Sequence, residues 1–271
     1  MIKKSLKAAL GLLPKSAQNG IRERYWQVKS RFLYQSLYKA LELENTLSSG
    51  ITLQVRSKGE WWTYNDIFVN GEYDVPILHA LEKSSAHRPL RVLDLGANVG
   101  YFALRVTDLI RQEHPGTHVE ISMVEGSSRV FADLKARMES QPLPELSSRL
   151  VHGLVGARTG AASMRESAVH VKNTIMYDAG TRGPKTQFLD LSVLMENTDE
   201  IDLLKCDIEG AELLFLENYA ELLGKVRSAV FELHHEQCDT LKCREILKKN
   251  GFRETVLRDT PTFSVNFMTR D

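Results

Sequence analysis

The chain has 271 residues, 42% of them hydrophobic and 26% charged, a composition that excludes a wholly disordered or fibrous protein. Lysine plus arginine and aspartate plus glutamate both number 35, so the chain lacks the excess positive charge typical of nucleic-acid-binding proteins. Three cysteines, and no uncharged apolar stretch long enough to span a bilayer, predict a reduced, cytoplasmic protein.

The first forty residues are strongly basic, with nine lysines and arginines and a single acid, Glu23. Apolar residues between Ile2 and Leu13 recur at helical spacing beside lysines, which predicts a short amphipathic helix. Such a helix lies on an anionic membrane surface or docks on its own domain or a partner, and both interpretations stay open. A second helix is predicted from Ile21 to Leu43.

Alternating residues and turn signals between Ile51 and Val75 predict a small β element. Aromatic residues crowd into it, and we predict that Trp62 and Tyr73 line a ligand pocket, with ordinary core packing as the alternative. Residues 1–75 are therefore predicted to form an N-terminal segment of helices and a small β element, ahead of a larger domain at residues 76–271.

Beyond Pro89, short β-type runs alternate with amphipathic helices, which predicts a doubly wound, mostly parallel α/β sheet. A closing antiparallel strand pair is expected at Thr255–Leu257 and Phe263–Phe267, and an irregular insertion at Arg158–Glu200. The predicted parallel strands are Arg91–Leu95, Val119–Val124, Leu150–Val155, Ile201–Cys206 and Val226–Leu233.

A glycine-containing turn follows the first of these strands, with Gly96, Asn98 and Gly100 before the next helix. In an open parallel sheet this turn lets a nucleotide-like ligand approach the helix N-terminus. A dinucleotide fingerprint would place its third glycine where this chain has Tyr101, which weakens a nicotinamide assignment. Asp94, ahead of the turn, would repel a pyrophosphate but can pair with an ammonium.

S-Adenosylmethionine carries that ammonium and has no phosphate, so it is the cofactor we predict. Glu125 ends the second strand, where a carboxylate can accept both ribose hydroxyls of a nucleoside. The predicted cofactor-binding residues are Asp94, Gly96, Ala97, Asn98, Gly100, Tyr101, Glu125 and Gly126.

Three stretches of the chain, Asp94–Phe102, Glu125 and Leu204–Glu212, resemble the FkbM family of S-adenosylmethionine-dependent methyltransferases. The resemblance extends from about Tyr73 to Phe252, and its most specific part is the block Asp-Ile-Glu-Gly-Ala-Glu that ends at Glu212. It implies a class I methyltransferase fold, Rossmann-like, for residues 76–271, and O-methylation of a hydroxyl on a saccharide or natural product.

Acidic residues and a histidine end the fourth and fifth strands, at the sheet edge where open α/β proteins bind ligands. We predict His234 as the general base that removes the acceptor hydroxyl proton, and Asp207 or Glu209 as the group that orients it or the hydroxyl. Strand alternation separates Glu232 and His234 from His235, so only part of this cluster is expected to face one pocket.

Glu232 and His235 are predicted acceptor contacts, together with Trp62 and Tyr73. Glu212, in the first turn of the next helix, is interpreted in one of two ways. It either belongs to the ligand-binding edge of the sheet, here called the rim, together with Asp207, Glu209, Glu232 and His234, or it is an acid that complements the helix dipole.

Two alternatives to this prediction remain open, and a third is disfavoured. Asp207, Glu209, Glu232 and His234 could together bind a divalent cation such as Mg²⁺ that lowers the pKa of the acceptor hydroxyls. The chain could also be a catalytically silent, cofactor-binding scaffold subunit, recruited through its basic N-terminal segment. A zinc site is disfavoured because the spacing of the candidate ligands fits no standard pattern; these are His234, His235, Cys238 and Cys243.

Overall fold

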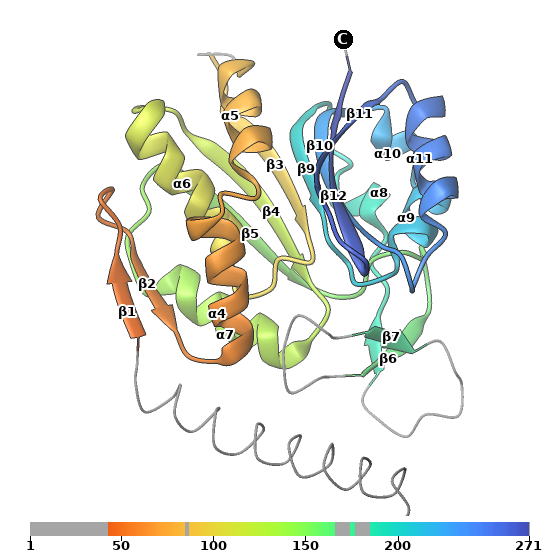
Figure 1. Ribbon diagram of the computed structural model, residues 1–271, viewed down its shortest axis with the longest axis horizontal. Helices are drawn as coiled ribbons and strands as arrows, with labels where there is room; N and C mark the ends of the chain where they lie inside the picture. Colours follow the sequence, from red (N-terminus) through yellow and green to blue (C-terminus); the bar gives the residue numbers. More distant parts are fainter. Residues whose placement is uncertain (1–42, 85–86, 166–173, 177–184, 271) are drawn as a thin grey trace, which may run out of the picture.

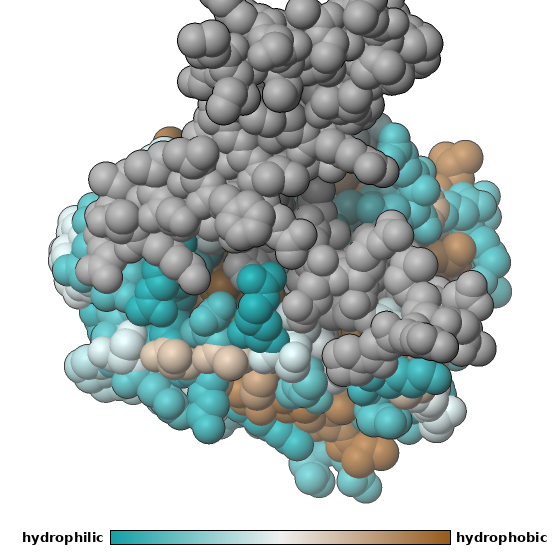
Figure 2. Space-filling view, turned by 90° about the horizontal axis from the view of Figure 1, so that it is seen from below, coloured by the Kyte–Doolittle hydropathy of each residue, from teal (hydrophilic) through white to brown (hydrophobic). Residues whose placement is uncertain are grey.

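The structure is a computed structural model that describes residues 43–84, 87–165, 174–176 and 185–270. The basic N-terminal helix, and the second predicted helix except for Leu43, lie outside the described residues. No helix in the described ranges is both long enough and apolar enough to cross a membrane. Seen from below, the described surface is mostly hydrophilic with patches of hydrophobic residues (Figure 2).

A seven-stranded sheet forms the centre of the molecule, in the order β11-β12-β10-β9-β3-β4-β5 (Figure 1). Only β12 runs against the other strands, and it pairs with β10 and β11, so the prediction of a mostly parallel sheet with a C-terminal antiparallel pair is confirmed. The strands are β3 (Leu90–Leu95), β4 (Val119–Glu125), β5 (Leu146–His152), β9 (Ile201–Cys206), β10 (Val226–His234), β11 (Arg253–Asp259) and β12 (Phe263–Thr269).

Most strand limits follow the sequence pattern, because the inner strands are rich in apolar residues and lie between turn signals. The predicted limits of β9 are those observed, whereas β5 begins at Leu146, four residues before the predicted Leu150. No residue of the edge strand β5 is buried, whereas all six residues of β9 are, so β5 gives a weaker apolar signal in the sequence.

Helices cover both faces of the sheet and give three layers. One apolar cluster joins the sheet to α5 (Asp74–Glu82), α6 (Tyr101–Glu113) and α7 (Ser128–Glu139). A second cluster covers the other face with α8 (Leu191–Leu194), α9 (Glu212–Asn218), α10 (Ala220–Leu223) and α11 (Thr240–Lys249).

The segment ahead of α5 is mainly helical, so the predicted β element from Ile51 to Val75 is wrong beyond its first strand. A hairpin of β1 (Leu43–Thr46) and β2 (Thr52–Val55) leads into α4 (Lys58–Tyr64) and a π-helical turn, η2 (Asn65–Val69). The start of α4 is set by Ser57, whose hydroxyl accepts a hydrogen bond from the Glu60 amide. This Ser-x-x-Glu cap outweighs the alternating aromatic pattern.

A buried ion pair fastens this segment to the main domain. Glu60 of α4 accepts a 2.8 Å hydrogen bond from Arg137 of α7, and both side chains are almost completely buried. The Tyr101 hydroxyl and Arg137 both donate to the carbonyl of Gln54, at 2.7 and 2.8 Å. These contacts hold β2 and α4 over the start of α6. The division at Val75 stays a prediction; it falls inside α5.

Part of the insertion predicted from Arg158 to Glu200 is regular. Three short strands, β6 (Ala161–Arg165), β7 (Thr174–Met176) and β8 (Lys185–Gln187), form an antiparallel sheet in the order β7-β6-β8.

Candidate functional site

A cavity of about 1310 Å³ opens at the carboxyl edge of the sheet. The chain leaves β3 toward β4 and β5 on one side and returns to β9 and β10 on the other, so β3 and β9 meet at the point where open α/β sheets bind ligands. The α4–η2 segment and the ends of β11 and β12 complete the wall. Of the residues predicted for the site, the cavity is lined by Trp62, Tyr73, Ala97, Asn98, Tyr101, Asp207, Glu209, Glu232 and His234.

The turn after β3 packs directly against the end of β9. Gly96, Asn98 and Gly100 all have positive φ angles, of 77°, 49° and 88°, a conformation that glycine and asparagine adopt most readily. A Cβ atom on Gly96 would lie 1.7 Å from the carbonyl oxygen of Asp207. The turn therefore approaches β9 more closely than any side chain at position 96 permits.

Glu125, at the end of β4, clamps this turn. Its two carboxylate oxygens accept hydrogen bonds from the amides of Asn98 and Ser127, at 2.9 and 2.8 Å. Burial raises the pKa of Glu125 to about 7, although the two amides act in the opposite direction. A carboxylate has further lone pairs, so the predicted ribose contact stays a prediction. Glu125, with Asp94, Gly96, Gly100 and Gly126, lies behind the residues that line the cavity.

The sequence analysis missed Lys205, which lies at the centre of the site. Its ammonium donates to the Gly96 carbonyl at 2.6 Å and lies 3.3 Å from Asp94 Oδ1 and 3.6 Å from Asp207 Oδ2. Asp94 is fully buried and its charged partner in the structure is Lys205. The sequence analysis had predicted the ammonium of a ligand in this place. A lysine inside β9, whose six residues are all buried, was the signal available in the sequence.

Burial alone would lower the pKa of Lys205, but the neighbouring Asp94 and Asp207 outweigh it and the pKa is raised. The pKa of Asp94 is raised because its burial outweighs the lysine. Lys205 therefore stays a cation at neutral pH and joins the β3 turn to the end of β9.

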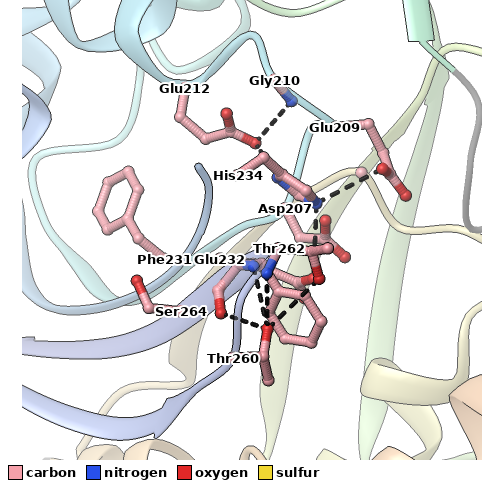
Figure 3. Close-up of polar contacts among 12 residues, drawn as sticks. Asp207, Glu209, Gly210, Glu212, Phe231, Glu232, His234, Thr260, Thr262 and Ser264 are labelled. Carbon is pink, nitrogen blue, oxygen red and sulfur yellow. Dashed lines mark hydrogen bonds and ion pairs between the residues drawn. The ribbon is translucent and has the colours of Figure 1, made fainter. Parts of the chain in front are cut away.

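His234 is held by Glu212, and Figure 3 shows its ring between the acids of the rim. Its Nδ1 lies 3.0 Å from Glu212 Oε1, an oxygen that also accepts from the Gly210 amide at 3.0 Å. Glu212 is fully buried. Its carboxylate makes Nδ1 the protonated nitrogen and directs Nε2 toward Glu209 and Glu232, at 3.4 and 3.5 Å.

The hydrogen-bonded partner of His234 Nδ1 is thus Glu212, which the sequence analysis did not assign to this role, while Glu209 contacts Nε2. That Asp207 or Glu209 orients the acceptor hydroxyl stays a prediction. Glu212 is more than an acid at a helix end, because its side chain turns back to the rim. Glu209 itself has a φ of 53°, a left-handed conformation that costs a glutamate about 1 kcal/mol and marks a functional position in many proteins.

The predicted acceptor contacts divide as strand alternation indicated. The Tyr73 hydroxyl lies 3.5 Å from Glu232 Oε2, and Trp62 is 37% exposed on the cavity wall. His235 does not line the cavity, and its Nε2 lies 3.4 Å from Asp259 instead. The assignment of His235 as an acceptor contact is therefore wrong for this cavity.

Arg258 is a second residue that the sequence analysis missed. It lies at the bulge of β11, and its Nη1 donates to Glu72 at 2.5 Å and to Asp66 at 2.8 Å. This contact ties the η2–α5 segment to the C-terminal strands across 186 and 192 positions of sequence, respectively. Such a distant pairing leaves no local pattern in the sequence.

Residues 94–254, more than half of the chain, match the family model described as the methyltransferase FkbM domain. The chain belongs to the FkbM methyltransferase family. The match begins at Asp94 and includes the β3 turn, Glu125 and the acids of the rim. A search among curated proteins found no relative similar in sequence.

Solved structures similar to this FkbM methyltransferase are distant. A methyltransferase FkbM from Methylobacillus flagellatus KT is 14% identical with a TM-score of 0.46, over 66% of this chain and 43% of that one. A precorrin-6y C5,15-methyltransferase from Geobacter metallireducens GS-15 is 12% identical with a TM-score of 0.42, over 73% and 88%. Aeropyrum pernix fibrillarin, in complex with natively bound S-adenosyl-L-methionine, is 15% identical with a TM-score of 0.40, over 71% and 74%.

The rim of this FkbM methyltransferase holds protons at neutral pH. Burial would lower the pKa of His234, but the hydrogen bond and charge of Glu212, with Asp207 and Glu232, raise it to about 10. Burial and Asp207 raise the pKa of Glu209 to about 9. His234 is therefore an imidazolium at neutral pH, and a positively charged ligand would lower these pKa values.

Three side chains at the ends of β9 and β10 lie close enough together to hold a metal ion. Among the described residues, ligand atoms of Asp207, Glu232 and His234 all lie within 4.8 Å of one another. A histidine whose second nitrogen donates to a buried carboxylate, as here to Glu212, is typical of metal ligands. Glu209, the fourth predicted ligand, is not in this group, and the described residues bring together no zinc site with Cys238 and Cys243.

Proposed function

We propose that this protein is an S-adenosylmethionine-dependent O-methyltransferase that acts on a hydroxyl of a saccharide or natural product. The observation that carries the proposal is the cavity itself, which joins the β3 turn to the Glu212–His234 pair at the edge between β3 and β9. Family membership supports methyl transfer. We propose S-adenosylmethionine as the cofactor, an oxygen as the methyl acceptor, and a saccharide or natural product as the acceptor's chemical class.

The residues present fit this cofactor. The cavity wall is rich in carboxylates, and Asp207 Oδ1 is a buried oxygen without a hydrogen-bond partner in the structure. Such a wall suits a positively charged, phosphate-free nucleoside and disfavours a pyrophosphate. When bound, S-adenosylmethionine supplies a methyl group on a sulfonium sulfur. Asn98 and Glu125, at the β3 turn, are the residues we assign to its nucleoside part.

His234 is the residue we propose to move the proton. Its Nε2 accepts the proton of the acceptor hydroxyl, while Glu212 keeps Nδ1 protonated and stabilises the imidazolium that results. This role requires neutral imidazole, which the neighbouring Glu212, Asp207 and Glu232 disfavour because they raise the pKa of His234. Entry of a positive ligand beside Asp207 and Glu232 favours loss of the His234 proton, so the base becomes available only in the loaded cavity.

His234→Gln is expected to lower kcat by about 10²–10⁴-fold, the usual contribution of a general base. The measurement is transfer of a labelled methyl group to a panel of glycosides and polyhydroxylated natural products. Exposed His118 is the matched control, and His118→Gln should leave kcat unchanged. Wild-type kcat should rise with pH as His234 loses its proton, and this limb should vanish in His234→Gln. Equal activity of both variants would remove His234 from the mechanism.

As an alternative to His234 as the base, we propose that Asp207, Glu232 and His234 bind a divalent cation, which would polarise the acceptor hydroxyl. In this alternative His234 is a metal ligand and does not take the proton. Mn²⁺ is the probe, because its electron paramagnetic resonance signal reports binding directly. Asp207→Asn should weaken Mn²⁺ binding about tenfold or more, since it removes a charged ligand. Exposed Asp199 is the control, and Asp199→Asn should not change it. Wild-type protein that leaves millimolar Mn²⁺ free would reject the cation.

A scaffold subunit without catalysis is the second candidate. It predicts cofactor binding, no transfer to any acceptor, and no loss of biological function in His234→Gln. The Glu212–His234 pair argues against it, because a buried carboxylate that fixes a histidine tautomer is typical of catalytic and metal-binding histidines.

A further inference from the structure

Acidic side chains outnumber basic ones on the cavity wall. Six carboxylates line it, and they come from η2 and the loop after it, the turn after β9, and β10 with the loop that follows. They are Asp66, Glu72, Asp207, Glu209, Glu232 and Glu236.

The cations of the wall are already paired. Lys205 and Arg258 are the lysine and arginine residues among the lining residues that the structure describes. Lys205 faces Asp94 and Asp207, and Arg258 donates to Glu72 and Asp66 at 2.5 and 2.8 Å. Within the described wall, neither the ammonium nor the guanidinium is left for an anionic ligand.

The remaining cationic groups do not change this balance. Lys58 lies over the Trp62 ring, 4.6 Å from its centroid, but is not a lining residue. The imidazolium of His234 faces three carboxylates, those of Glu209, Glu212 and Glu232. Phosphate and carboxylate groups are normally bound by arginine, lysine or open helix N-termini, so beside the acidic residues at the ends of β9 and β10 this wall lacks side chains that recognise them. The carboxylate of S-adenosylmethionine must therefore be bound away from these acids.

Aromatic side chains are the second main group of residues in the cavity wall. Trp61 and Trp62 of α4 are 38% and 37% exposed, large values for tryptophan, and Phe263 faces the cavity from the opposite side of the sheet edge. Indole faces pack against apolar C–H surfaces, while carboxylates accept hydrogen bonds from hydroxyl or ammonium groups. Together these two kinds of group suit a polyhydroxylated ring.

We infer that the acceptor is an uncharged or amine-bearing saccharide or polyol, and that acceptors with a phosphate or carboxylate near the methylated hydroxyl are excluded. The inference rests on the proposed function, because it assigns a substrate class to the same cavity. An anionic group placed beside these six acidic side chains would lose its hydration and find no unpaired lysine or arginine in the described wall, and an unpaired buried charge of this kind is a strong source of discrimination between ligands.

The test uses matched acceptors on one aglycone: a glucoside, its glucosaminide, its glucuronide and its 6-phosphate. Methyl transfer is expected to the first two and not to the last two. Glu236 is exposed at the cavity wall, so Glu236→Lys should raise the ratio of anionic to neutral turnover at least about tenfold. The matched control Glu113→Lys, at the far end of α6, should leave the ratio unchanged. Wild-type preference for an anionic glycoside would overturn the inference.

A second measurement decides the case in which none of these glycosides is methylated. In the variant Trp26→Phe, the fluorescence comes from Trp61 and Trp62 of the cavity wall. With the quenching constant of neutral acrylamide as reference, the constant for caesium should exceed that for iodide. Glu236→Lys should reduce the difference between the caesium and iodide constants. Equal or stronger quenching by iodide would overturn the inference. Calorimetry with S-adenosylmethionine is run in parallel, since absent binding there would defeat the proposed function without altering the quenching result.

Discussion

Gly96→Ala is expected to destabilise the protein by about 3 kcal/mol or more and to abolish cofactor binding. The new Cβ would lie 1.7 Å from the Asp207 carbonyl, and the backbone, at a φ of 77°, disfavours any side chain. The β3 turn and the end of β9 must then move apart, which also breaks the 2.6 Å contact between Lys205 and the Gly96 carbonyl. Urea unfolding measures the first effect and calorimetry the second.

Gly116→Ala separates the clash from the backbone strain. Gly116 has a φ of 92°, but a Cβ there would meet nothing within 4 Å. Its loss of stability should be about 1 kcal/mol, the cost of a left-handed alanine alone. If the two variants lost equal stability, the close approach between β3 and β9 would not exist as described.

Lys205→Met is expected to cost about 3–5 kcal/mol at neutral pH, because it leaves two carboxylates, those of Asp94 and Asp207, without their cation. Because the folded-state pKa of Lys205 is raised, its stabilisation is present throughout the neutral range and is lost only at strongly alkaline pH. In the variant, protonation of Asp94 relieves the repulsion, so the deficit should shrink as the pH falls. Urea unfolding at pH 7 and pH 5 checks both statements.

Two further variants test whether the effect belongs to this buried pair. The double variant Lys205→Met with Asp94→Asn should recover much of the lost stability, which gives a coupling energy from the double-mutant cycle. Lys242, whose side chain is 50% exposed, pairs with Glu217 on the surface. Lys242→Met should cost no more than about 1 kcal/mol, and a comparable loss there would show that burial is not the cause.

The sequence predicts the sheet well because its signals are local. Ile201–Cys206 is a mostly apolar segment that lies between Glu200 and Asp207, and its limits are those of β9. Asp207, Glu232 and His234 reach one cavity because the ends of parallel strands share one edge of a sheet. Alternation along β10 correctly separates His234 from His235.

The partners of these residues were beyond the sequence because they depend on how distant segments pack. Glu212 reaches His234 across 22 positions, and Arg258 reaches Glu72 across 186. Lys205 lies inside a buried strand, so the sequence indicates that its ammonium must have acidic partners. The sequence does not indicate which acids they are. The helix α4 was missed for a different reason, since its Ser57 cap was present in the sequence and the aromatic alternation was given more weight.

Calorimetric titration with S-adenosylmethionine tests the central claim most directly. The account predicts saturable one-to-one binding, and no binding of NAD or ATP. Glu125→Gln should weaken S-adenosylmethionine binding about tenfold or more. The carboxylate of Glu125 accepts hydrogen bonds from two backbone amides, and the NH₂ group of glutamine would face one of these donors without accepting from it. Exposed Glu120, on the same strand, is the control, and Glu120→Gln should bind as wild type does. Tight binding of NAD or ATP, with no heat from S-adenosylmethionine, would contradict the account.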